Sequence, residues 1–166
     1  MAVVIRERTV NLTTFTGTWI PRFFREAELK ATYSKDRSRK VGCVIVNHRN
    51  VMLTSGWNGF PRDVDDDVDE RHERPAKYLW TEHAERNAIY NAASMGIPLM
   101  GSKAFVTLFP CADCMRALLQ SGVIEIICPQ PNWEDESYKE SFAVAREMAN
   151  EAEVTITWIT EKEDDD

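Results

Sequence analysis

The second half of the chain alternates short apolar runs with amphipathic stretches, and this alternation constrains the fold more than any other feature of the sequence. Residues 104–108 (AFVTL), 123–128 (VIEIIC) and 154–159 (VTITWI) are typical of buried strands, and residues 110–122 and 137–149 between them have helical periodicity. Because parallel strands need a long crossover, usually a helix, this β-α-β-α-β succession predicts parallel pairing of the three strands.

The first half contributes two more helices and a hairpin. Residues 20–34 and 82–96 have the periodicity of helices, and residues 41–46 (VGCVIV) and 51–59 (VMLTSGWNG) predict two strands joined by a turn. Residues 60–75 are expected to form a polar loop. The order α-β-β-α-β-α-β-α-β predicts an α/β fold in three layers, α/β/α, with one five-stranded mixed sheet covered by helices on both faces.

Length and composition are those of one soluble domain. The chain has 166 residues and a net charge of −7, so we expect a single domain over residues 1–166, with a core at about 20–160 and an acidic, solvated tail at 161–166. No apolar stretch is long enough for a membrane span and no secretory signal is visible, which favours the cytoplasm, or the host cytoplasm if the chain is viral. The acidic balance argues against a polynucleotide partner and favours a small substrate.

Two short motifs place metal-binding chemistry at the starts of two predicted helices. Cys111 and Cys114, which follow Pro110, lie three residues apart and so share one helix face, and the helix N-terminus favours the thiolate form that binds metal. His83 begins the other helix. One imidazole and two thiolates make three ligands for Zn²⁺ and leave the fourth tetrahedral position for water, as in catalytic zinc sites. Glu85 is then placed to exchange protons with that water.

Each motif is weak alone. Most H-A-E tripeptides are ordinary helix starts, and a lone C-x-x-C also fits a redox pair or a structural zinc site. Together they form H-x-E…P-C-x-x-C, the signature of zinc-dependent nucleobase deaminases. The alternative of another class is a non-catalytic zinc-binding regulatory protein, in which Glu85 would be superfluous.

The other two cysteines, Cys43 and Cys128, lie in strand-like runs and are expected to be small buried residues.

Several longer segments extend the pattern: SKDRSRKVGCVIVN (34–47), GWNGFP (56–61), KY (77–78), HAERNAI (83–89) and TLFPCADCMRALLQSGV (107–123). In these segments and in their order the sequence resembles the cytidine deaminase-like superfamily, and specifically the deoxycytidylate (dCMP) deaminases. The resemblance covers roughly residues 20–160. It implies a three-layer fold and zinc-dependent hydrolytic deamination of dCMP to dUMP, which supplies thymidylate synthesis.

The resemblance also implies roles for individual residues. Glu85 would move protons to N3 of the cytosine and then to the departing ammonia, while activated water attacks C4. The Ala84 backbone would hold the pyrimidine edge, and Asn58 would contact the sugar. The 5′-phosphate would be bound by polar residues that precede the first predicted strand and that otherwise fit a solvated turn: Ser34, Lys35 and Arg39.

Many dCMP deaminases are hexamers that dCTP activates and dTTP inhibits, with Mg²⁺. The GWNGFP segment and the residues after it resemble that regulatory region, and four residues there are candidate effector contacts: Gly59, Arg62, Lys77 and Tyr78. The acidic run at 63–70 either helps to hold Mg²⁺ or forms a solvated loop. Some viral members of the family have a longer insertion here, with extra cysteine and histidine residues that bind a second, structural zinc ion. In this chain the insertion is short and His72 is its only such residue, so one zinc ion per chain is expected.

Two other branches of the same fold remain open. The tRNA adenosine deaminases share H-A-E, P-C-x-x-C and a G-W-N segment, but they would need a basic face for RNA. Free cytidine deaminases act on a substrate without a 5′-phosphate, so residues that bind phosphate distinguish them from dCMP deaminases.

Overall fold

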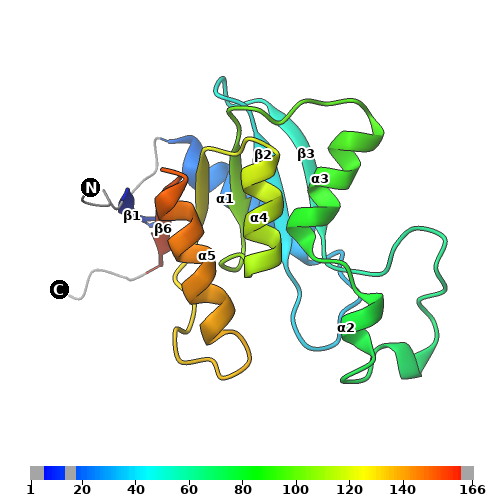
Figure 1. Cartoon of the computed structure of the whole chain (residues 1–166). Coiled ribbons are helices and arrows are strands. Elements are labelled where there is room, and N and C mark those ends of the chain that lie inside the picture. Colours follow the sequence, from blue (N-terminus) through cyan, green and yellow to red (C-terminus); the bar gives the residue numbers. More distant parts are fainter. Residues whose placement is uncertain (1–5, 14–17, 162–166) are drawn as a thin grey trace.

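The computed structural model describes residues 6–13 and 18–161 and is built around one six-stranded mixed sheet (Figure 1). The strand order is β1-β6-β5-β4-β2-β3, in which β1, β6, β5 and β4 are parallel neighbours and β2 runs antiparallel to both β4 and β3. The hairpin and the parallel pairing of the later strands are therefore confirmed. The strands span Glu7–Asn11 (β1), Gly42–Val46 (β2), Met52–Trp57 (β3), Lys103–Val106 (β4), Glu125–Pro129 (β5) and Thr155–Thr160 (β6).

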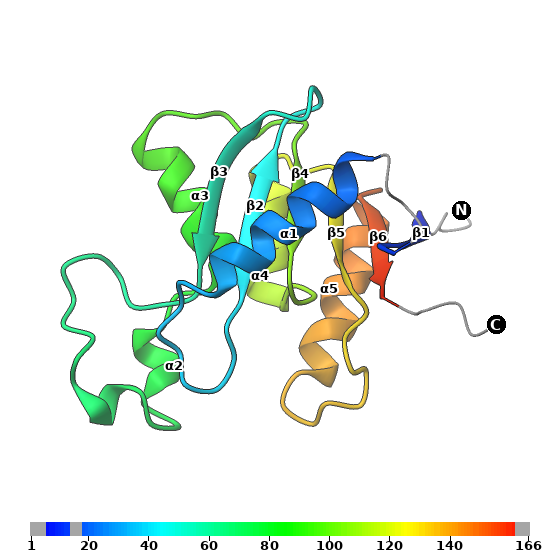
Figure 2. The same ribbon diagram turned by 180° about the vertical axis from the view of Figure 1, so that it is seen from behind.

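Helices cover both faces of the sheet and give the predicted α/β/α layers. Helix α1 packs on one face, and helices α3, α4 and α5 pack on the other (Figures 1 and 2). Alternate residues of β2 serve the two cores: Val44 and Val46 face α1, whereas Cys43 and Ile45 face the other three helices. The helices span Trp19–Ala31 (α1), Lys77–Trp80 (α2), Ala84–Ser94 (α3), Ala112–Gln120 (α4) and Lys139–Glu151 (α5).

The sheet has six strands, whereas the sequence predicts five. The additional strand, β1, pairs in parallel with β6 at the edge of the sheet, and only Val10 among its residues is buried. Its charged side chains are held by distant partners: Glu7 accepts two hydrogen bonds from Arg146, and Arg8 donates one to Glu125. An edge strand of this kind has no local hydrophobic pattern, which is why the sequence predicts only five strands.

Helix α3 approaches β3 closely because a glycine lies at the contact. A Cβ atom on Gly56 would lie 2.5 Å from the carbonyl oxygen of Ala84 and 2.5 Å from the backbone nitrogen of Ala88. Both alanines are fully buried, so the backbone of α3 rests directly on the strand. This contact sets the position of the N-terminus of α3 above the sheet.

Residues 60–75 are predicted as a polar loop, and the structure adds a short 3₁₀ turn at Asp69–Arg71, followed by α2. Figure 1 shows this excursion beyond the sheet, next to the start of α3. Gly59 and Glu82 tie its two ends together through reciprocal backbone hydrogen bonds of 3.0 and 2.8 Å. The excursion therefore begins and ends beside His83.

The acidic run at 63–70 is partly neutralised by the segment before β2. Asp66 pairs with Lys35, and Asp69 pairs with Arg37. Most of the predicted acidic tail, residues 162–166, lies outside the described residues. No helix in the described part of the chain is long and apolar enough to cross a membrane.

Candidate active site

Two helix N-termini meet and carry the predicted metal ligands. His83 immediately precedes α3, Cys111 occupies the same place before α4, and Cys114 lies in the first turn of α4. Nδ1 of His83 lies 3.5 Å from Sγ of Cys111 and 3.4 Å from Sγ of Cys114. All three ligand atoms lie within 4.8 Å of one another.

These separations fit a zinc ion. In a tetrahedral site with Zn–S of about 2.3 Å and Zn–N of about 2.05 Å, the N···S separation is about 3.6 Å. His83 would bind zinc through Nδ1, and Cys111 and Cys114 would bind it through their sulfurs. Three protein ligands leave one position for a further group, which is the arrangement of a catalytic rather than a structural zinc site.

The electrostatics of the cluster favour a thiolate at Cys111. Hydrogen bonds from Cys114 and His83 lower the pKa of the Cys111 thiol to about 4, although its burial acts in the opposite direction. Cys114 donates its proton to that sulfur and is itself buried, so the pKa of its own thiol is raised. A bound divalent cation would displace this shared proton, because metal ligation needs both sulfurs as thiolates.

Glu85 is a buried carboxyl group beside the cluster. It lies in the first turn of α3, is only 4% exposed and lines the same cavity as His83 and Cys111. Burial raises the pKa of the Glu85 carboxyl, and the nearby His83 lowers it in part. A carboxyl group whose pKa is raised toward neutrality is suited to both accepting and donating a proton.

His83, Cys111 and Glu85 line a cavity of about 250 Å³, and Cys114 lies against His83 and Cys111; these four residues are called the floor of the cavity. Apolar walls rise from this floor and are formed by Val41, Leu108, Phe109 and Phe142. The mouth of the cavity is formed by exposed or half-buried polar residues: Arg39, Arg74, Tyr78, Asp135, Ser137 and Tyr138. The cavity thus joins an apolar space for a flat ring to a polar rim that contains two arginines.

The family model described as the cytidine and deoxycytidylate deaminase zinc-binding region matches residues 17–130, which include the three ligands and Glu85. The chain belongs to this family. Two relatives agree with this membership. The deaminase is 40% identical over 142 residues to an uncharacterized deaminase of Aliivibrio fischeri, covering 85% of this chain and 93% of that one. It is 34% identical over 143 residues to the deoxycytidylate deaminase of Homo sapiens, covering 83% and 78%.

A solved structure shows the same fold. The dCMP deaminase of cyanophage S-TIM5, in complex with dCMP and dUMP, matches the deaminase with a TM-score of 0.66 at 23% identity. The match covers 84% of this chain and 95% of the phage chain. At this identity the likeness is one of fold.

The residues predicted to contact the nucleotide divide into two groups. Asn58, Ala84 and Arg39 line the cavity of the deaminase. Ser34 and Lys35 do not: Ser34 is buried and donates a hydrogen bond to the carbonyl oxygen of Asn58, and Lys35 faces a neighbouring cavity. The segment before β2 therefore presents Arg39 to the cavity and uses Ser34 for its own fold.

Asn58 fastens the end of that segment. Its Oδ1 accepts a hydrogen bond of 2.8 Å from the backbone of Val41, and its Nδ2 donates one of 2.9 Å to the carbonyl oxygen of Arg39. One lone pair of Oδ1 and one N–H of Nδ2 remain for a bound molecule. Asn58 is thus able to hold the local backbone and contact a ligand at the same time.

The residues predicted to contact an effector also fall in two places. Lys77 and Tyr78 line the cavity that contains Glu85. Gly59 and Arg62 line a separate cavity of about 250 Å³ beside α3, where Arg62 donates a hydrogen bond of 2.6 Å to Asn91.

Several residues at the cavity were not singled out from the sequence, among them Asp36, Arg74 and Tyr138. Asp36 lies in the segment at 34–47 that resembles the dCMP deaminases, but its ion-pair partner Lys77 is 41 residues away along the chain. Arg74 stands in a charged loop, where nothing local distinguishes it from its neighbours. Tyr138 follows the helical spacing of core residues, yet it lies at the mouth of the cavity. Only its position at the very start of α5 hints at this role.

Proposed function

We propose that this deaminase hydrolyses dCMP to dUMP and ammonia. The observation that carries the proposal is the position of Glu85 beside the His83–Cys111–Cys114 cluster, below a mouth that carries two arginines. Guanidinium groups bind phosphate well, whereas a free nucleoside has no charge for them to neutralise. The relatives named deoxycytidylate deaminase support the same substrate.

A zinc ion held by His83, Cys111 and Cys114 would supply an acidified water nucleophile near neutral pH. Glu85 accepts a proton from this water and donates it to N3 of the cytosine as the C4–O bond forms. Glu85 then accepts the remaining proton of that water, now on the hydroxyl group at C4, and transfers it to the exocyclic amino group as the C4–N4 bond breaks and NH₃ leaves. One dCMP and one water thus give one dUMP and one NH₃, and the Glu85 carboxylate is restored.

The remaining residues of the site orient the substrate. Phe109 and Val41 offer apolar surface to the pyrimidine ring, and the backbone of Ala84 lies beside Glu85, where it can meet the polar edge of the base. The free donor and acceptor of Asn58 suit a sugar hydroxyl. The base is thereby directed to the floor and the 5′-phosphate to the mouth.

The test is ammonia release by the zinc-loaded protein from dCMP, CMP, deoxycytidine and tRNA. We expect dCMP to give the highest kcat/KM. A higher kcat/KM with deoxycytidine would contradict the proposal and indicate a free nucleoside deaminase. Conversion of adenosine to inosine in tRNA, with no turnover of dCMP, would indicate the tRNA branch.

We further propose that dCTP activates and dTTP inhibits the enzyme, each with Mg²⁺, and that the enzyme is a hexamer. The separate cavity lined by Gly59 and Arg62 supports an effector site. Gly59 is hydrogen-bonded through its backbone to Glu82, the residue before His83. A ligand bound there would act on the segment that carries a zinc ligand. Rates measured with and without each nucleotide, and the molar mass in solution, test both points. Rates that neither nucleotide changes would contradict regulation.

A further inference from the structure

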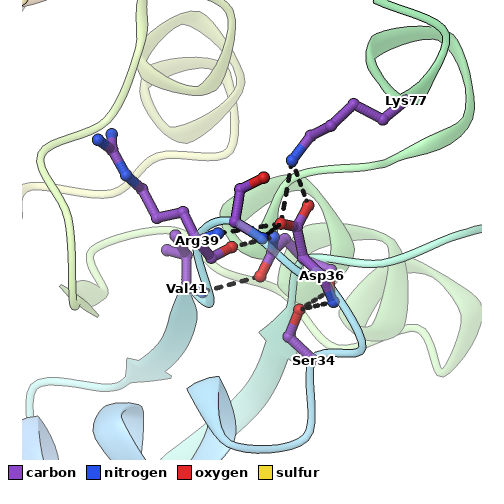
Figure 3. A network of polar contacts seen from close by, with 7 residues as sticks. Ser34, Asp36, Arg39, Val41 and Lys77 are labelled. Atoms are coloured by element: carbon purple, nitrogen blue, oxygen red, sulfur yellow. Dashed lines mark hydrogen bonds and ion pairs between the residues drawn. The ribbon is translucent and has the colours of Figure 1, made fainter. Parts of the chain in front are cut away.

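The cavity mouth is held by an ion pair between two segments that are distant in sequence. Lys77 Nζ lies 2.8 and 3.0 Å from the two carboxylate oxygens of Asp36, and the two side chains are only 10% and 7% exposed. No other ion pair among the described residues has both partners so deeply buried. Figure 3 shows Lys77 reaching from the α2 side toward the segment that precedes β2.

On one side, this pair fixes Arg39. Oδ1 of Asp36 also accepts hydrogen bonds from the backbone nitrogens of Ser38, at 2.7 Å, and Arg39, at 3.0 Å. The same carboxylate thus binds Lys77 and shapes the turn that presents Arg39 at the mouth. The Arg39 guanidinium lies 3.7 Å from Asp135 and 5.8 Å from the centre of the Tyr138 ring.

On the other side, Lys77 lies close in sequence to Arg74. Arg74 lies three residues before Lys77, and the backbone nitrogen of Lys77 bonds to the carbonyl oxygen of Glu73 in the same turn. The Arg74 side chain is exposed, lines the cavity and has no hydrogen bond or ion pair within the part of the chain that the structure describes. Arg39 and Arg74 line the same cavity together with Tyr138, so both guanidinium charges lie at one mouth.

We propose that Arg39 and Arg74 together bind the 5′-phosphate of the substrate, and that the buried Lys77–Asp36 ion pair positions these two arginines. The proposal rests on the function proposed above and adds to it a phosphate-binding residue, Arg74, and a pair of positioning residues. Lys77 and Asp36 neutralise each other, so the charge available to the phosphate comes from the two arginines.

The separation of Arg39 and Arg74 matters for phosphate binding because of the geometry of the guanidinium group. A guanidinium group binds phosphate through directed N–H donors, and two such groups can share one phosphate only if their separation is fixed. Arg39 and Arg74 lie on irregular segments that no helix or strand aligns. If Lys77 is lost, Asp36 becomes a buried charge without its partner, and both segments are released from each other.

The experiment compares KM and kcat for dCMP, together with the inhibition constant of inorganic phosphate, in zinc-loaded variants. We expect Arg74→Ala and Lys77→Met each to raise both KM and the phosphate inhibition constant roughly 10- to 100-fold, the range for a lost charge-assisted hydrogen bond. kcat should stay within about 3-fold of wild type, because the floor is untouched. Arg37→Ala is the matched control, since Arg37 lies on the same segment but pairs with Asp69 outside this cavity.

Several outcomes would overturn the inference. A fall in kcat with unchanged KM in Lys77→Met would show a general structural role, and an unchanged KM in Arg74→Ala would remove the phosphate site. Lys77→Arg keeps the charge and should restore most of the wild-type KM. If Lys77→Met does not fold, the KM and the phosphate inhibition constant of Arg74→Ala decide whether the phosphate site exists, because Arg74 is exposed. If wild type releases no ammonia from dCMP, the proposed function fails instead.

Discussion

The floor and the mouth of one cavity are built in different ways. The floor consists of His83, Glu85, Cys111 and Cys114, all at the N-termini of two helices that pack on the sheet. The mouth includes two irregular segments, those of Arg39 and Arg74, which the Lys77–Asp36 ion pair joins. In the proposed function, residues that hold the metal and move protons thus lie on rigid elements, and residues that bind the phosphate lie on segments held by charge.

Removal of a metal ligand should have the largest effect on the floor. In Cys114→Ser we expect the zinc content to fall toward zero and deamination to fall roughly 10⁴-fold or more, because the water nucleophile then keeps its ordinary pKa. Metal analysis and ammonia release measure the two effects. Cys128→Ala, an equally buried cysteine outside the cluster, should keep the ion. Full activity in metal-free Cys114→Ser would contradict the prediction that deamination needs a metal ion bound by the floor.

The next largest effect should come from proton transfer. Glu85→Gln keeps the size of the side chain but cannot accept a proton, so we expect kcat to fall about 10²- to 10⁴-fold with zinc retained. Single-turnover rates and metal analysis check this. Glu140→Gln is the matched control, since Glu140 is an exposed acid in the first turn of α5. Wild-type kcat in Glu85→Gln would contradict the mechanism.

Packing beneath the floor should have a smaller effect. In Gly56→Ala the new Cβ would press on backbone atoms of Ala84 and Ala88, so α3 must move away from β3. We expect the free energy of unfolding to fall by about 1–3 kcal/mol and kcat to fall with it, since Glu85 moves with the helix. Urea denaturation measures the first quantity. Gly59→Ala, whose Cβ would meet no atom within 4 Å, should leave stability nearly unchanged.

The smallest effect concerns the mouth and depends on pH. Burial acts to raise the pKa of the Asp36 carboxyl, but hydrogen bonds from Lys77 and from the Arg39 and Ser38 backbones outweigh it, so the pKa is lowered. The pair therefore contributes stability above the unfolded-state pKa of about 4 and loses it as pH falls through the folded-state pKa. In urea denaturation at pH 7, the free energy of unfolding of wild type should exceed that of Asp36→Asn, and this difference should shrink in acid. A difference that persists undiminished at low pH would contradict this.

The floor was largely predictable from the sequence, because its chemistry is local. His83 and Glu85 are neighbours, as are Cys111 and Cys114, and helical spacing together with the flanking strands is enough to bring these motifs together. The parallel pairing of the strands after residue 100 follows from the same alternation. Fold class and family membership therefore needed only short-range patterns.

The mouth and the sheet edge were not predictable in the same way, because each depends on a charge whose partner is far along the chain. Nothing near Asp36 indicates Lys77, and nothing near Glu7 indicates Arg146. Ser34 and Lys35 were assigned with Arg39 from one polar segment, but the turn around Asp36 sends only Arg39 into the cavity. Side-chain direction within an irregular segment is set by such tertiary bonds.

The pairing of β1 with β6 has a consequence for local opening of the sheet. β1 has a single neighbouring strand, and only one of its five residues is buried. β5 lies between β4 and β6, and four of its five residues are buried. Native-state hydrogen exchange should therefore find the β1 amides opening at a lower free energy than those of β5. Because β1 lies at the opposite edge of the sheet from β3, this edge can exchange while α3 stays packed against its strand.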